Sequence, residues 1–263
     1  MMDLEFFQLS DRGLVRENNE DHLGYVLPES EAQARSHGWL FALADGVGGQ
    51  LQGEVASKSA IETLIAGFRH ATAGEAPAAL LERLIQAANH HVHEAGLEAG
   101  AAGAGMATTI VACALRYDRV AVAHVGDSRC YLIRHGHVSP LTRDHTFARE
   151  QARLGLQSDA DSPTRHMLSR SLGSELFVSV DTSNHQVFAG DVLVLSSDGL
   201  HGSVTSADIA AALGQEADLE AAARCLVEIA NQRDGSDNIS VQLIRVRSVE
   251  QVGMYRGRPY RLR

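Results

Sequence analysis

Residues 39–50, WLFALADGVGGQ, constrain the fold most, because a short apolar run there ends in one carboxylate and then in three glycines within four residues. A run of this length between turn residues is typical of a strand buried on both faces, although periodicity alone does not exclude a short helix. Asp45 would then stand at the end of a rigid strand, where the glycines let a ligand approach main-chain atoms. Two interpretations stay open: a metal or phosphate site, or Asp45 as the N-cap of the next helix, which this stretch alone favours.

Length, composition and charge exclude several classes of protein. A chain of 263 residues that is 44% hydrophobic and 21% charged is long enough to bury a large core, and it has the composition of a globular protein. Its net charge of −10 argues against nucleic acid as a partner, because binding the phosphate backbone requires a basic surface. No apolar window approaches the ~18 residues of a membrane span, and no secretory signal is visible. We therefore expect a cytoplasmic protein with no membrane partner.

The three cysteines, Cys113, Cys130 and Cys225, are widely spaced and form no CxxC pair. This spacing fits neither a disulfide framework nor a thiolate zinc site. We expect buried structural thiols in a reducing compartment.

The order of predicted elements indicates an α+β domain. Strands are predicted at residues 4–9, 22–27, 39–45, 106–117, 119–127, 128–136, 137–142, 178–188, 191–199 and 238–246, with the stretch from 106 to 142 as an antiparallel meander. Helices are predicted near 55–68, 80–88, 206–213 and 219–232, with a polar helical segment over 147–173. Runs of strands with helices inserted in pairs predict layered antiparallel sheets.

Three connecting segments carry weaker signals. Residues 28–38 have the composition of a surface loop. Residues 96–105 are rich in Gly and Ala but lack the Lys-Ser/Thr ending of a phosphate loop, so we interpret them as a linker. Residues 248–263 contain four arginines beyond the last strand and are expected to form an exposed basic extension, either a frayed tail or a contact for an acidic partner.

Carboxylates stand at the ends of several predicted strands. They are Glu20, Asp21, Asp45, Asp127, Asp198 and Asp237. If these side chains converge at one edge of the stacked sheets, an all-oxygen cluster results, and such clusters select hard cations such as Mg²⁺ or Mn²⁺. Clustered carboxylates repel one another and are costly to bury without cations, so convergence would imply bound metal. Sequence gives the strand ends but not their order in space.

Six motifs occur in the order and approximate spacing of a known family. They are Arg16-x-x-Asn19-Glu20-Asp21, Ala44-Asp45-Gly46-Val47-Gly48-Gly49 with Gly53-Glu54, Gly105-x-x-Thr108-Thr109, Val125-Gly126-Asp127-Ser128-Arg129, Ser197-Asp198-Gly199 and Asp237-Asn238. Over about residues 5–246 the chain resembles the metal-dependent protein phosphatases, the type 2C serine/threonine phosphatases, in their bacterial branch. The resemblance reverses the preference for Asp45 as a helix cap.

The resemblance implies a fold and an activity. The expected fold is a four-layer α-β-β-α sandwich of two mainly antiparallel sheets flanked by helix pairs. Residues 1–247 would form one catalytic domain with a flap at about 146–173, followed by the extension at 248–263. The expected reaction is hydrolysis of phosphoserine and phosphothreonine in proteins by a metal-activated water at two Mn²⁺ or Mg²⁺ ions. The partners would be a phosphoprotein and a cognate serine/threonine kinase, and the protein would act as a monomer.

The resemblance also assigns the metal ligands. Asp45 would bridge both ions, the carbonyl of Gly46 would bind one, and Asp198 and Asp237 would bind the other. Asp127 would be the ligand of a third ion. The acid expected four residues after Asp198 is Gly202 in this chain, so a third ion is doubtful by the same resemblance.

The remaining site residues would handle substrate and protons. Arg16 would grip the phosphate, since a planar guanidinium makes bidentate contacts. Glu20 and Asp21 would act on the metal-activated water or just behind it, and Asn238 would assist beside Asp237. Val47 stands where eukaryotic members carry a histidine, so the general acid must be another group: either water at the metals or His201, for which a simpler interpretation is a residue at a helix start.

Two other functions remain open. Two residues depart from the family pattern: Gln50, where bacterial relatives often have His, and Gly202. Such departures are expected in a non-catalytic member that only binds phosphoproteins. A phosphatase acting on small phosphate esters would carry the same motifs.

Overall fold

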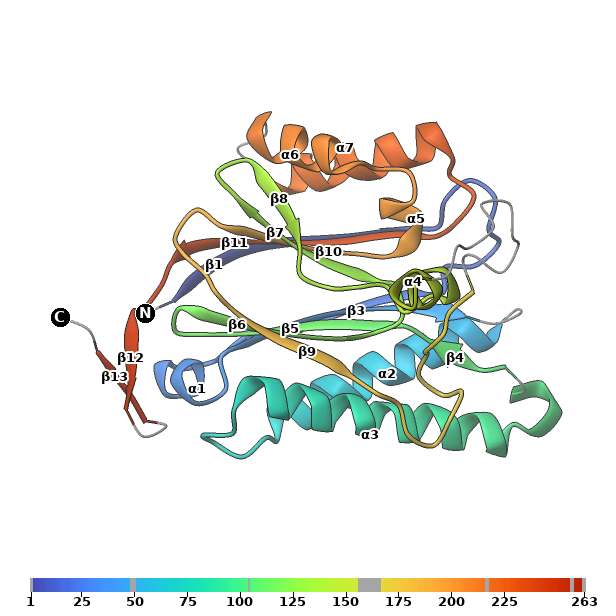
Figure 1. The fold of residues 1–263 in the computed structure, drawn as a ribbon, viewed down its shortest axis with the longest axis horizontal. Helices are drawn as coiled ribbons and strands as arrows, with labels where there is room; N and C mark the ends of the chain where they lie inside the picture. The colour runs from blue at the N-terminus through green and yellow to red at the C-terminus, as the bar shows by residue number, and fades with distance from the viewer. Residues whose placement is uncertain are drawn as a thin grey trace.

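Two antiparallel sheets stacked face to face form the centre of the molecule, and helix pairs cover their outer faces (Figure 1). The computed structural model describes residues 2–47, 51–103, 105–155, 167–215, 218–255 and 258–261. The layers run α6/α7, sheet, sheet, α2/α3 from top to bottom in Figure 1. The predicted four-layer α-β-β-α sandwich is therefore confirmed.

Strands distant in sequence make up each sheet. The first sheet has the order β1 (Asp3–Asp11), β11 (Ile239–Ser248), β10 (Val192–Ser196), β7 (Arg129–Arg134), β8 (His137–Pro140). The second has the order β2 (Asp21–Val26), β3 (Trp39–Val47), β5 (Ile110–Arg116), β6 (Arg119–Val125), β9 (Asp181–Gln186), with β4 (Ala107–Thr108) paired to the end of β3. The covering helices are α2 (Leu51–Arg69) and α3 (Pro77–Glu98) on the second sheet, and α6 (Ser206–Gln215) and α7 (Leu219–Arg233) on the first.

Strand β3 shows why the sandwich holds together. Its side chains alternate between two cores: Leu40, Ala42 and Ala44 pack with the α2/α3 helices, and Trp39, Phe41 and Leu43 pack between the two sheets. Because a strand presents successive side chains to opposite faces, an unbroken apolar run is what a strand buried on both faces requires. The prediction for this strand is confirmed, and the strand continues two residues beyond Asp45.

The meander predicted over residues 106–142 is wrong as a single sheet. Hairpin β5–β6 belongs to one sheet and hairpin β7–β8 to the other, so the chain crosses between the sheets at Gly126 and Asp127. Gly126 has a φ of +103°, and a Cβ there would meet Cβ of Thr109 at 2.6 Å, so the crossing requires glycine. Strands β9 and β10 likewise lie in different sheets. A period-two pattern predicts strands but does not tell a hairpin from a crossing.

Three segments differ in their local structure. Residues 31–36, predicted as loop, form helix α1 (Glu31–Ser36), because the Ser30 side chain accepts a hydrogen bond from Gln33 N at 3.2 Å as an N-cap. Within its described residues, the polar segment predicted as helical over 147–173 is helical at α4 (Phe147–Arg153). Residues 167–180 contain no helix, and residues 156–166 lie outside the described residues.

The carboxyl-terminal extension is not simply frayed. It contains β12 (Val252–Tyr255) and β13 (Arg258–Arg261), which pair as an antiparallel hairpin. Figure 1 places this hairpin at the left, at the opposite end of the molecule from α4 and α5 (Asp198–His201). Among the described residues, no helix is both long and apolar enough to cross a membrane.

Candidate functional site

Five distant segments of the chain deliver acidic side chains to one cleft. Asp45 lies directly opposite Asp21 in the β2–β3 register, Asp198 begins α5 just after β10, and Asp237 precedes β11. A cavity of about 480 Å³ is lined by the predicted site residues Arg16, Glu20, Asp45, Gly46, Asp127, Asp198 and Asp237. The convergence that sequence alone left as a hypothesis is present in the structure.

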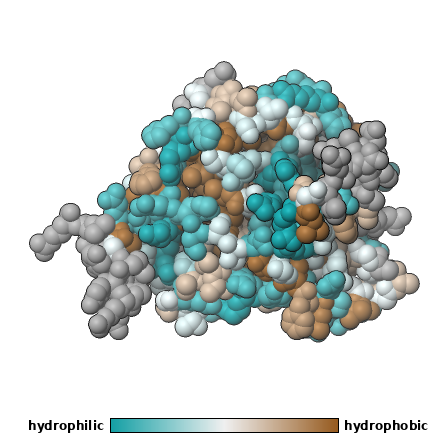
Figure 2. All heavy atoms as spheres, in the orientation of Figure 1, coloured by the Kyte–Doolittle hydropathy of each residue, from teal (hydrophilic) through white to brown (hydrophobic). Residues whose placement is uncertain are grey.

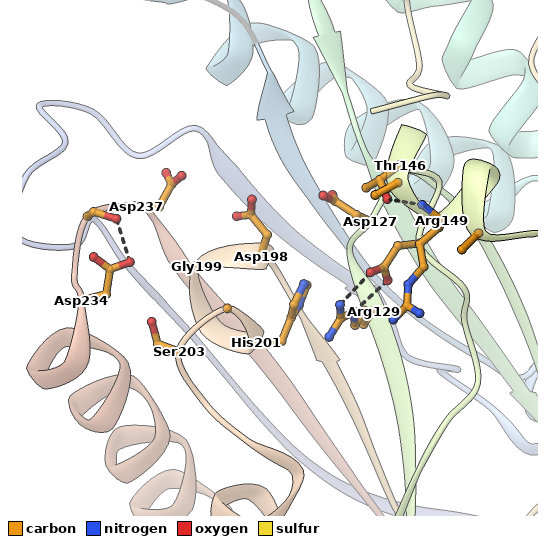
Figure 3. Close-up of a pocket in the computed structure, with 15 residues that line it drawn as sticks. Asp127, Arg129, Thr146, Arg149, Asp198, Gly199, His201, Ser203, Asp234 and Asp237 are labelled. Atoms are coloured by element: carbon orange, nitrogen blue, oxygen red, sulfur yellow. Dashed lines mark hydrogen bonds and ion pairs between the residues drawn. The ribbon is translucent and has the colours of Figure 1, made fainter. Parts of the chain in front are cut away.

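A second cavity, of about 680 Å³, opens on the other side of the same acids. It shares Asp127, Asp198 and Asp237 with the first cavity and extends between α4 and the loops around α5 and α7 (Figure 3). In Figure 3, Asp198 and Asp237 lie on one wall, and Arg129 and Arg149 lie on the other. The acids therefore stand in the middle of an elongated cleft.

Two threonines fix the backbone of Asp45. Thr109 N donates to the Asp45 carbonyl at 2.8 Å, the Thr108 hydroxyl donates to the same carbonyl at 2.8 Å, and Asp45 N donates to the Thr109 hydroxyl at 3.1 Å. With its main chain held on both sides, Asp45 has a fixed direction into the cleft. The sequence motif contained this threonine pair but did not reveal its task.

Gly46 is required by close packing. A Cβ at Gly46 would lie 2.3 Å from the carbonyl oxygen of Gly53 in α2 and 2.8 Å from the carbonyl oxygen of Glu20. A Cβ at Gly53 would in turn lie 2.7 Å from Oε2 of Glu20. The two glycines let β3, α2 and the loop that carries Glu20 meet at one point.

Asn238 anchors the loop of residues 12–20. Its side chain accepts from Glu20 N at 2.8 Å and donates to the carbonyls of Arg12 and Asn18, both at 2.9 Å. Asn238 itself is buried, so these three bonds are partly buried. Asn238, which was predicted as an accessory residue, therefore contacts and positions the loop that carries Arg16 and Glu20.

Arg16 reaches the acidic cluster from this loop. Its guanidinium donates to Asp237 at 2.8 Å, and its side chain is half-exposed. The hydrogen bond to Asp237 raises the pKa of Arg16, against the opposing effect of burial. A cation with one face on the cluster and one face in solvent is well placed for an incoming anion.

Burial makes the innermost carboxylates costly to ionise. It raises the pKa of Asp21 to about 7, and the nearby charges of Asp198 and Asp237 act in the same direction. The hydroxyls of Ser197 and Ser240 oppose this shift, yet neither oxygen of Asp21 has a partner in hydrogen-bonding geometry. Burial, followed by the charge of Asp21, raises the pKa of Asp45 well above its ordinary value.

The outer carboxylates show the same repulsion. Burial and the charge of Asp198 raise the pKa of Asp127 to about 7. Burial and the charge of Asp237 raise the pKa of Asp198, and burial raises the pKa of Glu20. An all-oxygen donor set with unpartnered buried oxygens and mutual repulsion is what hard divalent cations stabilise, so these residues fit the expected Mg²⁺ or Mn²⁺.

His201 is a poor candidate for the general acid. It is the last residue of α5, lines the larger cavity and makes a 3.2 Å contact from Nδ1 to the Ser196 hydroxyl. Burial, together with the charge of Arg129, lowers its pKa to about 3. A group that is neutral above this pH has no proton to give readily at neutral pH, and the simpler interpretation as a structural residue fits better.

Of the departures from the family pattern, those at Gly202 and Val47 lie within the described residues. Gly202 is the C-cap of α5 with helical backbone, and it leaves Asp127 without the second acid expected for a third ion. Val47 is partly exposed and lines the smaller cavity. Gly48, Gly49 and Gln50 lie outside the described residues.

The base of the flap is held by ionic contacts. Arg129 makes a bidentate pair with Asp144, at 2.8 and 2.6 Å, just before α4. Nearby, His124, His145 and Asp181 bring three potential ligand atoms within 4.8 Å of one another. Arg170 already lies among them, 2.9 Å from Asp181 Oδ1 and 3.3 Å from His145 Nε2, so a cation would have to displace a guanidinium. We interpret this group as a structural clamp.

The cysteines play no part in the cleft. Cys113 and Cys130 are free and fully buried between the sheets, as expected, whereas Cys225 is only partly buried against the α6/α7 core. None of the three lines either cavity of the cleft.

The sandwich and its acidic cleft define the class of metal-dependent protein phosphatases. The sequence profile described as Protein phosphatase 2C matches residues 16–243. The chain belongs to this family.

Individual relatives agree with the assignment. The serine/threonine phosphatase stp of Listeria innocua is 34% identical over 244 residues, which cover 89% of this chain and 93% of that protein. The solved structure of the S. agalactiae serine/threonine phosphatase superposes with a TM-score of 0.84 at 33% identity, covering 93% of this chain and all of that one. The catalytic domain of the phosphatase PstP, solved with two manganese ions, gives a TM-score of 0.77 at 34% identity, covering 94% and 99% of the two chains.

Proposed function

We propose that the protein hydrolyses phosphoserine and phosphothreonine in proteins at a centre of two Mn²⁺ or Mg²⁺ ions. One observation carries the proposal: the acids of five separate segments line one cleft with the Arg16 guanidinium among them. Relatives of similar length are named serine/threonine phosphatases, and one is solved with two manganese ions.

Each site residue has a proposed task. Asp45, Asp198, Asp237 and the Gly46 carbonyl would hold the two ions, and Asp127 is the remaining acid for a third. The ions would supply charge neutralisation for the phosphoryl oxygens and a nucleophile at neutral pH. Without them the carboxylates would repel the substrate phosphate.

The other residues prepare the substrate. Arg16 would turn from Asp237 to the phosphate, and its planar fork suits bidentate contact with two phosphoryl oxygens. Glu20, which lines the cleft, would accept a hydrogen bond from the attacking water, and Asp21, which is buried and lines neither cavity, would act from just behind it. Asn238 would keep Arg16 and Glu20 in position through the loop that it anchors.

The wider context is also proposed. Residues 1–247 would act as one catalytic domain, with 146–173 as the flap. A serine/threonine kinase must phosphorylate the substrate first, so we infer a cognate kinase in the same compartment, the cytoplasm. One chain carries every proposed ligand, so the protein would act as a monomer.

The test uses full-length protein and a phosphothreonine peptide. Mn²⁺ should support phosphate release, chelator should abolish it, and Asp198→Asn should reduce it to background. Asp234→Asn is the matched control, because Asp234 lines the same cleft but is exposed and bonds only Ser236 in the described structure. Full activity in Asp198→Asn or in chelator would contradict the mechanism.

The two alternatives are separated by companion measurements. A non-catalytic member would bind phosphopeptide in calorimetry without turnover. A small-ester phosphatase would hydrolyse p-nitrophenyl phosphate at a higher kcat/KM than any phosphopeptide.

A further inference from the structure

The cleft has two lobes of different chemistry on either side of the shared acids. Apart from Arg16 and the acids, the smaller lobe is lined by apolar side chains, those of Val47, Ala107, Met167 and Leu168, and by the hydroxyls of Thr109, Ser171 and Ser174. The larger lobe lies against α4 and is lined by arginine, acid and small residues. A phosphorylated residue held at Asp127, Asp198 and Asp237 would thus leave its peptide neighbours in two distinct environments.

Arg149 is a cation of the larger lobe that forms no ion pair with the described residues. The other arginine of that wall, Arg129, is neutralised by its bidentate pair with Asp144. Arg149 is exposed, and its guanidinium makes no hydrogen bond or ion pair with the described residues. It is close enough to Asp144 to help lower the pKa of that carboxyl, but Asp144 already has two hydrogen bonds from Arg129. The α4 wall therefore carries one net positive charge.

The position of Arg149 is fixed at its backbone, while its guanidinium has no partner among the residues that the structure describes. Arg149 N donates to the Thr146 hydroxyl, the N-cap of α4, so the residue sits in the first turn of the helix. Figure 3 shows the Arg149 side chain beside Arg129 on the wall that faces Asp198. In Figure 2 hydrophilic and hydrophobic atoms lie side by side where Figure 1 places α4, in keeping with the exposed Phe147 at the start of this helix.

The other walls of the cleft, as far as their residues are described, do not provide an equivalent cation. Among the described residues that line the smaller lobe, the one basic residue is Arg16, which is paired with Asp237 and assigned to the phosphate itself. Across the larger lobe, Asp234 is an exposed acid, so an anion is favoured only along the α4 wall. Charge selection should then act on one side of the phosphorylated residue.

We propose that Arg149 binds a second anionic group of the substrate, so that the enzyme prefers phosphopeptides with such a group on one side of the phosphorylated residue. The group is the carboxylate of Asp or Glu, or a second phosphorylated residue, since both offer oxygens in the geometry that a guanidinium accepts. The inference rests on the proposed phosphatase activity and adds to it the class of preferred substrate.

The experiment measures kcat/KM of the Mn²⁺-loaded full chain on phosphothreonine peptides in an alanine background. A single Asp is placed in turn at each of the four positions on either side. We expect Asp on one side to raise kcat/KM by about five- to tenfold over alanine, the size of one partly exposed charge-assisted contact, and Asp on the other side to have no such effect. Phosphoserine at the best position tests the second source of the anion.

Two variants of Arg149 test the inference, and a third variant, at Arg153, is the control. Arg149→Gln should reduce the Asp-to-Ala ratio to near one, and Arg149→Glu should invert it in favour of Lys at the same position. Arg153→Gln removes the same charge one turn further along α4, where the guanidinium is 3.2 Å from Glu150 and does not line the cleft, and should keep the ratio.

The outcomes separate this inference from the proposed function. Turnover without one-sided preference, or a preference that survives in Arg149→Gln, would overturn the role of Arg149 and leave the phosphatase activity standing. Absence of turnover on every phosphopeptide would overturn the proposed function and the inference with it. Circular dichroism of the variants checks that α4 and the fold are retained.

Discussion

Replacing Asp21 by Asn should stabilise the metal-free protein at pH 8. Burial and the charges of Asp198 and Asp237 raise the pKa of Asp21 from 3.8 to about 7. Each pKa unit corresponds to about 1.4 kcal/mol, so the ionised carboxylate destabilises the folded state by about 4 kcal/mol at pH 8. An Asn amide must find partners among Ser197 and Ser240, which we expect to reduce the net gain to about 1–3 kcal/mol.

The direction of the stability change with pH follows from the raised pKa of Asp21. Because the folded pKa lies above the unfolded one, the folded protein binds the proton more tightly, and stability falls as pH rises from about 4 to about 7. Asp127, whose pKa is also about 7, contributes in the same direction. The gain from Asp21→Asn should therefore be present at pH 8 and absent at pH 4.5.

Urea unfolding in chelator at the two pH values measures the effect. Asp234→Asn, an exposed change in the same cleft, should shift stability by less than about 0.5 kcal/mol at both. An equal effect of Asp21→Asn at pH 4.5 and pH 8, or a loss of stability at pH 8, would refute the electrostatic reasoning.

Two further substitutions test the packing of the site. Asn238→Ala should cost about 2–4 kcal/mol, since three partly buried hydrogen bonds are lost, and should lower kcat/KM on phosphopeptide because Arg16 loses its support. Unchanged kcat/KM would contradict the positioning role. Gly46→Ala should cost about 1–3 kcal/mol in urea unfolding and weaken Mn²⁺ binding, because its Cβ would meet Gly53. Gly214→Ala in α6, which has open space, should instead stabilise by about 0.5–1 kcal/mol, and equal effects at the two glycines would argue against the close approach.

Sequence predicted the layers and the residues of the site because both leave local patterns. The apolar run of β3, the helical spacing of α2 and α3 and the acids at strand ends are each visible within a short window. The preference for Asp45 as a metal ligand came from the order of six motifs, since the stretch around it alone favours a helix cap.

The missed features depend on contacts between segments far apart in the chain. Whether the chain at Gly126 makes a hairpin or crosses to the other sheet depends on which strands pair with β7. Asn238 contacts residues more than two hundred positions away, and Arg149 is notable only because Arg129 already satisfies Asp144. No local pattern carries such information.

Crystals soaked in Mn²⁺ and measured at the manganese absorption edge test the central claim most directly. We predict two anomalous peaks in the cleft, with oxygens of Asp45, Asp198 and Asp237 as ligands. The result that would contradict the account is an empty acidic cleft, with manganese absent or bound instead among His124, His145 and Asp181.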